Sequence, residues 1–184
     1  MDSALKYHGE VATGYDAKRE SQTKWHEENR LMREFIKDLP AGTSVVDVPV
    51  GTGRFIPLYE ELGFHVHGID ISEDMLREAA RKAKSDTTYL RTGNAIELDA
   101  PDKSYDLAVC IRLFRWISSD EVIDVLEELQ RVASKRVIFN ARVCDHPYQR
   151  PFQLLLMGLR PEWLIKRVDA IEPNYLMFML ERRQ

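Results

Sequence analysis

The order of apolar and polar residues along the chain predicts helices that alternate with strands. Apolar side chains recur at helical spacing over 23–37, which predicts an amphipathic helix. Short runs rich in branched apolar residues predict strands at 45–48, 64–70, 87–90, 105–111 and 136–140. Helical stretches follow Gly53, begin at Ser72, and cover about 119–133 and 151–159, with Ser119 or Asp120 expected to cap the third of these. This alternation favours an α/β fold with a mostly parallel, doubly wound sheet.

The last part of the chain departs from this rhythm. Residues 163–170 and 175–181 are both strand-like, and the short link Glu172-Pro173-Asn174 joins them. Two strands joined by a short turn form an antiparallel hairpin. The predicted fold is therefore a Rossmann-like, mostly parallel sheet of seven strands that ends in a C-terminal antiparallel hairpin.

A loop after the first predicted strand carries the clearest chemistry. The segment 45–55 combines a buried strand, the acid Asp47 and a small-residue loop with Gly51 and Gly53 before a helix. Ligands of doubly wound sheets bind outside the carboxyl ends of the strands, and glycine lets the backbone approach them closely. A second acid, Asp70, ends the next strand, where carboxylates bind ribose hydroxyls. The sequence therefore predicts a site for a nucleoside-containing cofactor.

Two classes of cofactor fit such a loop. A dinucleotide site has a third glycine, and Ile56 occupies that position here. A carboxylate at Asp47 is also of little use to a pyrophosphate. S-Adenosylmethionine carries no phosphate but has a cationic ammonium and a sulfonium, for which Asp47 is a suitable neighbour. The loop therefore favours S-adenosylmethionine over a nicotinamide dinucleotide.

The spacing Asp47-x-Pro49-x-Gly51-x-Gly53 resembles the first motif of the class I S-adenosylmethionine-dependent methyltransferases, acid-x-Gly-x-Gly-x-Gly. Pro49 stands where the family has a glycine, and because proline cannot adopt positive φ, the loop must bend by another route there. The C-terminal hairpin is also similar to the end of that family's sheet.

Later segments carry the resemblance further along the chain. Residues 68–72 with Met75 look like the second motif, which implies that Asp70 binds the ribose and Ile71 lies beside the adenine. Residues 93–95 resemble the third loop, with Asn94 in place of an acid, and 105–110 resemble the fourth strand, whose end faces the methyl group.

The resemblance implies an enzyme that uses S-adenosylmethionine and releases S-adenosylhomocysteine. It also implies one domain over 1–184, with 1–40 as an N-terminal segment and helix that forms a lid and 41–184 as the Rossmann-like core. The cofactor-binding residues expected on this basis are Tyr15, Arg19, Asp47, Val48, Pro49, Gly51, Gly53, Asp70, Ile71, Met75, Gly93, Asn94, Ala95 and Ile111.

The methyl acceptor should be bound by the loops after the fourth and fifth strands, which contain aromatic residues and arginines. Arg112 and Arg115 suit a small acceptor with an apolar body and an anionic group, since arginine pairs well with carboxylate or phosphate. Solvated loop arginines are the alternative interpretation. His146 is a candidate general base, which the reaction needs only if the acceptor starts protonated.

Composition narrows the remaining alternatives. The net charge is −4 with both signs interspersed, so the chain lacks the basic stripe of nucleic-acid-binding proteins. The cysteines Cys110 and Cys144 have neither CxxC nor zinc spacing, and no metal site is expected. No apolar leader or long apolar run is present, so a cytoplasmic protein that does not enter the membrane is expected. Still open are a non-catalytic regulatory partner that binds S-adenosylmethionine, an RNA or protein methyltransferase, an NAD-dependent oxidoreductase, and oligomer formation.

Overall fold

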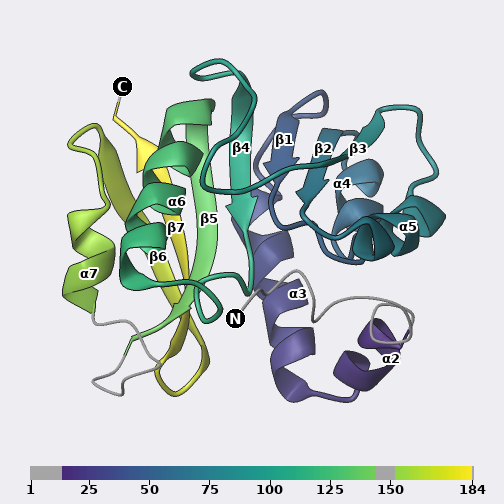
Figure 1. Cartoon of the computed structure of the whole chain (residues 1–184), viewed down its shortest axis with the longest axis horizontal. Coiled ribbons are helices and arrows are strands. Elements are labelled where there is room, and N and C mark those ends of the chain that lie inside the picture. The colour runs from purple at the N-terminus through teal and green to yellow at the C-terminus, as the bar shows by residue number, and fades with distance from the viewer. Residues whose placement is uncertain (1–13, 144–151, 184) are drawn as a thin grey trace. The chain divides into compact units, whose positions relative to one another are not determined.

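The computed structural model describes residues 14–143 and 152–183, and their strands form one seven-stranded sheet in the order β3-β2-β1-β4-β5-β7-β6 (Figure 1). The strands are β1 Ser44–Asp47, β2 His65–Asp70, β3 Thr88–Thr92, β4 Tyr105–Cys110, β5 Ala133–Arg142, β6 Trp163–Glu172 and β7 Tyr175–Arg182. The helices are α2 Tyr15–Glu20, α3 Thr23–Ile36, α4 Ile56–Glu61, α5 Glu73–Lys82, α6 Ser119–Val132 and α7 Phe152–Met157. The parallel strands with a terminal antiparallel pair confirm the predicted fold class.

The chain divides into two compact units, residues 1–94 and 95–184. The expectation of a single domain over 1–184, with 1–40 as a lid, stays a prediction.

In the first unit, β1, β2 and β3 pair in parallel, with Asp47 opposite Gly68 and Asp70 opposite Thr92. Helices α4 and α5 pack against β2, and α5 also packs against β3 (Figure 1). Because the strands are parallel, their carboxyl ends lie at one edge of the sheet, followed by the glycine loop and by α5.

The start of α5 follows the sequence prediction closely. Ser72 is the N-cap, and its side chain accepts a hydrogen bond from the Met75 backbone N–H. Met75 and Ala79 are buried on the inner face of α5, whereas Ala80 is exposed. Ala79 packs in a cluster with Val50 and Ile56, so α5 is held directly beneath the glycine loop.

In the second unit, β4 and β5 are parallel, and β7 pairs antiparallel with both β5 and β6. The predicted hairpin is therefore confirmed, and it turns at Asn174, whose φ is +60°. The rings of Phe139 and Phe178 stack across β5 and β7 with centroids 4.9 Å apart. Helix α6 packs on β4 and β5, and α7 packs on α6.

The cap of α6 differs from the sequence prediction, which named Ser119 or Asp120. The N-cap is Ser118, which forms a capping box with Glu121: each side chain bonds the other residue's backbone N–H. Only Ser118 has Glu121 three residues further on, so the reciprocal bond selects it.

Candidate functional site

Asp70 joins the end of β2 to the glycine loop and to α5. Its Oδ2 accepts a hydrogen bond from the Gly51 N–H at 2.8 Å, and its Oδ1 accepts one from the Ser72 N–H at 2.9 Å. The Asp70 side chain is buried. Burial raises the pKa of Asp70, while the backbone hydrogen bonds from Ser72 and Gly51 oppose that shift. The predicted ribose-binding acid is therefore also the residue that fixes the loop.

The glycine loop needs its two glycines for different reasons. Gly51 has φ +56° and Gly53 has φ +70°, a region that residues with a Cβ rarely adopt. A Cβ at Gly51 would meet open space. A Cβ at Gly53 would lie 2.9 Å from both Cα and Cβ of Ala79. At Pro49, which stands in place of a glycine, the Val48–Pro49 peptide bond is cis.

Asp47 is a second buried carboxyl group, at the end of β1. The Tyr59 hydroxyl donates a hydrogen bond to its Oδ2 at 3.2 Å. Burial raises the pKa of Asp47 to about 8, and the nearby negative charge of Asp70 acts in the same direction. Burial also raises the pKa of Tyr59. At neutral pH, Asp47 is therefore mainly protonated until a cation compensates its charge.

Arg54 ties the same loop to α3. Its Nη1 donates to Glu28 Oε2 at 2.6 Å, its Nε donates to Asn29 Oδ1 at 2.9 Å, and its guanidinium lies 3.8 Å from the centre of the Trp25 ring. The Glu28 side chain is fully buried. Sequence reasoning missed this pair, although Glu28 lies at helical spacing between Trp25 and Leu31 on the apolar face of α3, where a lone acid signals a buried partner.

The remaining predicted residues of the first unit lie in α2, after β2 and after β3. Tyr15 and Arg19 both belong to α2, with the Arg19 guanidinium 5.2 Å from the Tyr15 ring centre. Ile71 follows β2 and is 53% exposed, and its predicted contact with an adenine stays a prediction. The Gly93 N–H donates to the Asp70 carbonyl at 3.1 Å. Asn94 is exposed, and Val48 is buried.

In the second unit, Arg112 follows β4 in a left-handed conformation, with φ +66°. The backbone N–H of Arg112 donates to Asn140 Oδ1 at 2.7 Å, and the Asn140 side-chain amide donates to the Tyr175 hydroxyl at 2.7 Å. The Arg142 guanidinium lies 4.9 Å from the Tyr175 ring centre. Arg112, Asn140, Arg142 and Tyr175 are named the strand-end cluster below.

The other candidate site residues of the second unit lie outside the strand-end cluster. Arg115 is exposed, with its guanidinium 4.7 Å from the Trp116 ring centre. Ala95 and Ile111 are buried. Cys110 is buried at the end of β4. His146 and Cys144 lie outside the described residues.

Within residues 14–143 and 152–183, no group of three or more histidine, cysteine, aspartate or glutamate side chains could hold a metal ion. In the same ranges, no helix combines the length and apolar character needed to cross a membrane. The expected cytoplasmic location stays a prediction.

The chemistry of the site suits a cationic nucleoside better than a diphosphate. Two buried acids lie beside the loop, and the Gly51 N–H, which a phosphate oxygen would need, is bonded to Asp70. Pro57 in the first turn of α4 removes another backbone donor. Fold and site together define a class I, Rossmann-like domain of the kind found in S-adenosylmethionine-dependent methyltransferases.

Comparison with known proteins gives the family. The family model described as "Methyltransferase domain" matches residues 45–136, which include the glycine loop, Asp70 and β4. The chain belongs to this methyltransferase family.

The chain also matches particular methyltransferases. Demethylmenaquinone methyltransferase of Listeria welshimeri is 38% identical over 116 residues, covering 59% of this chain and 46% of that protein. Phosphatidylethanolamine N-methyltransferase of Cereibacter sphaeroides is 36% identical over 107 residues, covering 56% and 46%. The chain thus spans about half the length of the curated relatives it matches. A solved S-adenosylmethionine dependent methyltransferase from Mesorhizobium loti shares the fold, with a TM-score of 0.71 at 17% identity, covering 89% of this chain and 99% of that one.

Replacing each loop glycine by alanine should separate conformational strain from steric conflict. Gly51→Ala should lower the free energy of unfolding by about 1 kcal/mol, because only the positive φ is penalised. Gly53→Ala should lower it by about 2–4 kcal/mol, because its Cβ also meets the backbone of α5. Urea unfolding of both variants measures the difference, and equal losses would contradict the close approach of Gly53 to Ala79.

The raised pKa of Asp47 predicts a pH-dependent stability of the cofactor-free protein. Between pH 4 and the folded pKa of about 8, the folded protein holds a proton that the unfolded chain has lost. Asp47 therefore stabilises the fold at low pH, and this contribution is lost as pH rises through that window, by at most about 1.4 kcal/mol per pH unit. Asp47→Asn keeps an acceptor for Tyr59 and should be more stable than wild type at pH 8, with a smaller difference at pH 5. Urea unfolding at the two pH values tests this, and a difference independent of pH would refute it.

Proposed function

We propose that this chain transfers the methyl group of S-adenosylmethionine to a small acceptor that has an apolar body and an oxygen-bearing or anionic group. The observation that carries the proposal is the pair of buried carboxyl groups, Asp47 and Asp70, beside the glycine loop of a methyltransferase-family domain.

Each acid has a distinct part in holding the cofactor. Asp70 keeps free lone pairs after bonding Gly51 and Ser72, so it can also accept hydrogen bonds from ribose hydroxyls. Burial raises the pKa of Asp47 to about 8, and the cofactor's ammonium would lower it and make Asp47 an ion-pair partner. When bound, S-adenosylmethionine would supply an electrophilic methyl carbon; an electron pair of the acceptor, either a lone pair or the π electrons of an activated ring carbon, would form the new bond as the carbon–sulfur bond breaks, and the sulfur would keep that bond's electrons in S-adenosylhomocysteine.

The protein's main task in such a displacement is alignment. Holding the acceptor in a near-attack position can supply much of the rate acceleration. A base is required only when the acceptor atom carries a proton, and His146 is the residue proposed for that role.

The strand-end cluster supports the proposed acceptor class. Asn140 accepts a hydrogen bond from the backbone N–H of the left-handed Arg112 and donates one to Tyr175, so the main chain that carries the Arg112 side chain is fixed. A guanidinium pairs well with carboxylate or phosphate. The names of the two relatives describe a quinone-type and a lipid-type acceptor, both of which combine an apolar body with oxygen atoms.

The cofactor assignment is tested by binding. Wild type should bind S-adenosylhomocysteine and not NAD, measured by calorimetry. Asp70→Asn should weaken S-adenosylhomocysteine binding at least about tenfold, because charge-assisted hydrogen bonds to the ribose are lost. Asp86→Ala, at an exposed aspartate of the same unit, is the control and should bind as wild type does. Binding of NAD alone, or unchanged affinity in Asp70→Asn, would contradict the assignment.

The acceptor assignment is tested by turnover with a demethylated quinol and with an aminophospholipid. Arg112→Ala should raise the acceptor KM about tenfold or more and leave the affinity for S-adenosylhomocysteine unchanged, since it removes an ionic contact with the acceptor. Arg183→Ala, at an exposed arginine of the same unit, should change neither. Cofactor binding without turnover of either acceptor would instead favour a non-catalytic partner subunit.

A further inference from the structure

We propose that Asp16, Thr52 and Lys82 form a latch that holds α2 on the glycine loop and that sets the affinity for the cofactor. The inference rests on the proposed function, because the loop is taken to bind S-adenosylmethionine. The three residues are named the α2 latch. Asp16 and Lys82 act in it as positioning residues, through Thr52.

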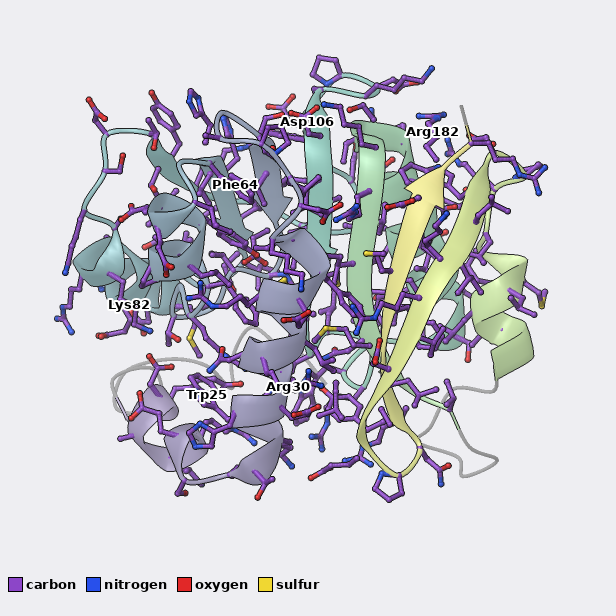
Figure 2. All side chains as sticks on the ribbon, turned by 180° about the vertical axis from the view of Figure 1, so that it is seen from behind. Trp25, Arg30, Phe64, Lys82, Asp106 and Arg182 are labelled. Carbon is purple, nitrogen blue, oxygen red and sulfur yellow. The ribbon has the colours of Figure 1, made fainter. Side chains whose placement is uncertain are left out.

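The latch joins three elements that are far apart in the sequence. Thr52 lies between Gly51 and Gly53, and its hydroxyl donates to Asp16 Oδ1 of α2 at 2.6 Å. Lys82, in the last turn of α5, donates to Asp16 Oδ2 and lies 3.5 Å from the Thr52 hydroxyl oxygen. Figure 2 shows Lys82 at this end of α5. The carboxylate of Asp16 thus bonds the loop and α5 at the same time.

The burial of the three side chains makes these contacts consequential. Thr52 is 3% exposed, and a buried hydroxyl that loses its acceptor costs free energy. The Asp16 and Lys82 side chains are 23% and 29% exposed, so their ion pair is less screened than one at the surface. Removing Asp16 would leave both a buried hydroxyl and a partly buried ammonium without this acceptor.

Helix α2 depends on polar contacts for its position. None of its residues from Tyr15 to Glu20 is buried, so it gains little from apolar packing. A short helix without a buried face is marginal by itself. Besides its contacts with α3, α2 is therefore tied to the glycine loop by the bonds from Asp16.

The latch affects the cofactor site through both Thr52 and Lys82. Thr52 is the neighbour of Gly51, whose N–H bonds Asp70. Lys82 ends the helix that Ser72 begins, and the Ser72 N–H bonds the same carboxylate. Fixing Thr52 and α5 together restricts the loop to the conformation in which Asp70 is placed for the ribose. Such pre-organisation lowers the cost of binding.

The first experiment measures S-adenosylhomocysteine affinity by calorimetry in Asp16→Ala, Lys82→Ala and the double variant. Each single variant should bind about tenfold more weakly than wild type, and the double variant should be no weaker than the weaker single variant. Lys82→Arg keeps the charge and should restore most of the affinity. The double variant Glu78→Ala/Arg81→Ala removes an ion pair of the same helix and should bind within about twofold of wild type.

The second experiment measures hydrogen exchange of the α2 amides with and without S-adenosylhomocysteine. Because coupling between two sites is reciprocal, the ligand should slow α2 exchange in wild type by roughly the factor that the latch adds to affinity. Asp16→Ala should exchange fast in both states. Thr52→Val, which removes only the hydroxyl, should behave in the same way and serves if Asp16→Ala does not fold.

The outcomes separate the two proposals. Wild type that fails to bind S-adenosylhomocysteine overturns the proposed function. Wild type that binds, together with unchanged affinity in Asp16→Ala and Thr52→Val, overturns the latch. Exchange of α2 that is equally fast in wild type and Asp16→Ala overturns the latch whether or not the ligand binds.

Discussion

The bond between Asp70 and the Gly51 N–H is the contact on which the rest of the site depends. Asp70 ends β2, Gly51 belongs to the loop after β1, and the same carboxylate bonds Ser72 at the start of α5. Parallel pairing brings the ends of β1 and β2 to one edge of the sheet. The Asp70 side chain then determines the path of the glycine loop away from that edge. The positive φ of Gly51 and the close approach of Gly53 to α5 are consistent with this one anchor.

Desolvation then explains which ligand the site suits. Two carboxyl groups buried near each other cannot both carry charge without a compensating cation. Asp47 meets this constraint by holding its proton, with a pKa of about 8 and a hydrogen bond from Tyr59. A phosphate would add negative charge to this setting, whereas an ammonium or sulfonium would relieve it. The preference for a cationic nucleoside therefore follows from burial as much as from the motif.

The features that the sequence predicted correctly are those that short local patterns determine. The hairpin, the Ser72 cap and the spacing of Asp47, Gly51 and Gly53 all depend on neighbours within a few residues. The predicted N-cap of α6 was wrong because Ser118, Ser119 and Asp120 are all suitable capping residues, and the position of Glu121 decides among them. The partners in the α2 latch and in the Arg54–Glu28 pair lie too far apart in sequence for any short pattern to join them.

The Arg54–Glu28 pair links α3 to the glycine loop, and the α2 latch links α2 to it. The two connections differ in burial and therefore in function. The Arg54–Glu28 pair is 9% and 0% exposed, and breaking such a pair by removing one partner costs about 3–5 kcal/mol. Trp25 packs on the same guanidinium, which adds to the attachment of α3 to the loop. In the α2 latch Thr52 is buried, but Asp16 and Lys82 are 23% and 29% exposed, and no residue of α2 is buried. Releasing α2 therefore costs less than breaking the Arg54–Glu28 pair, so α2 can respond to the cofactor while α3 keeps the loop in place.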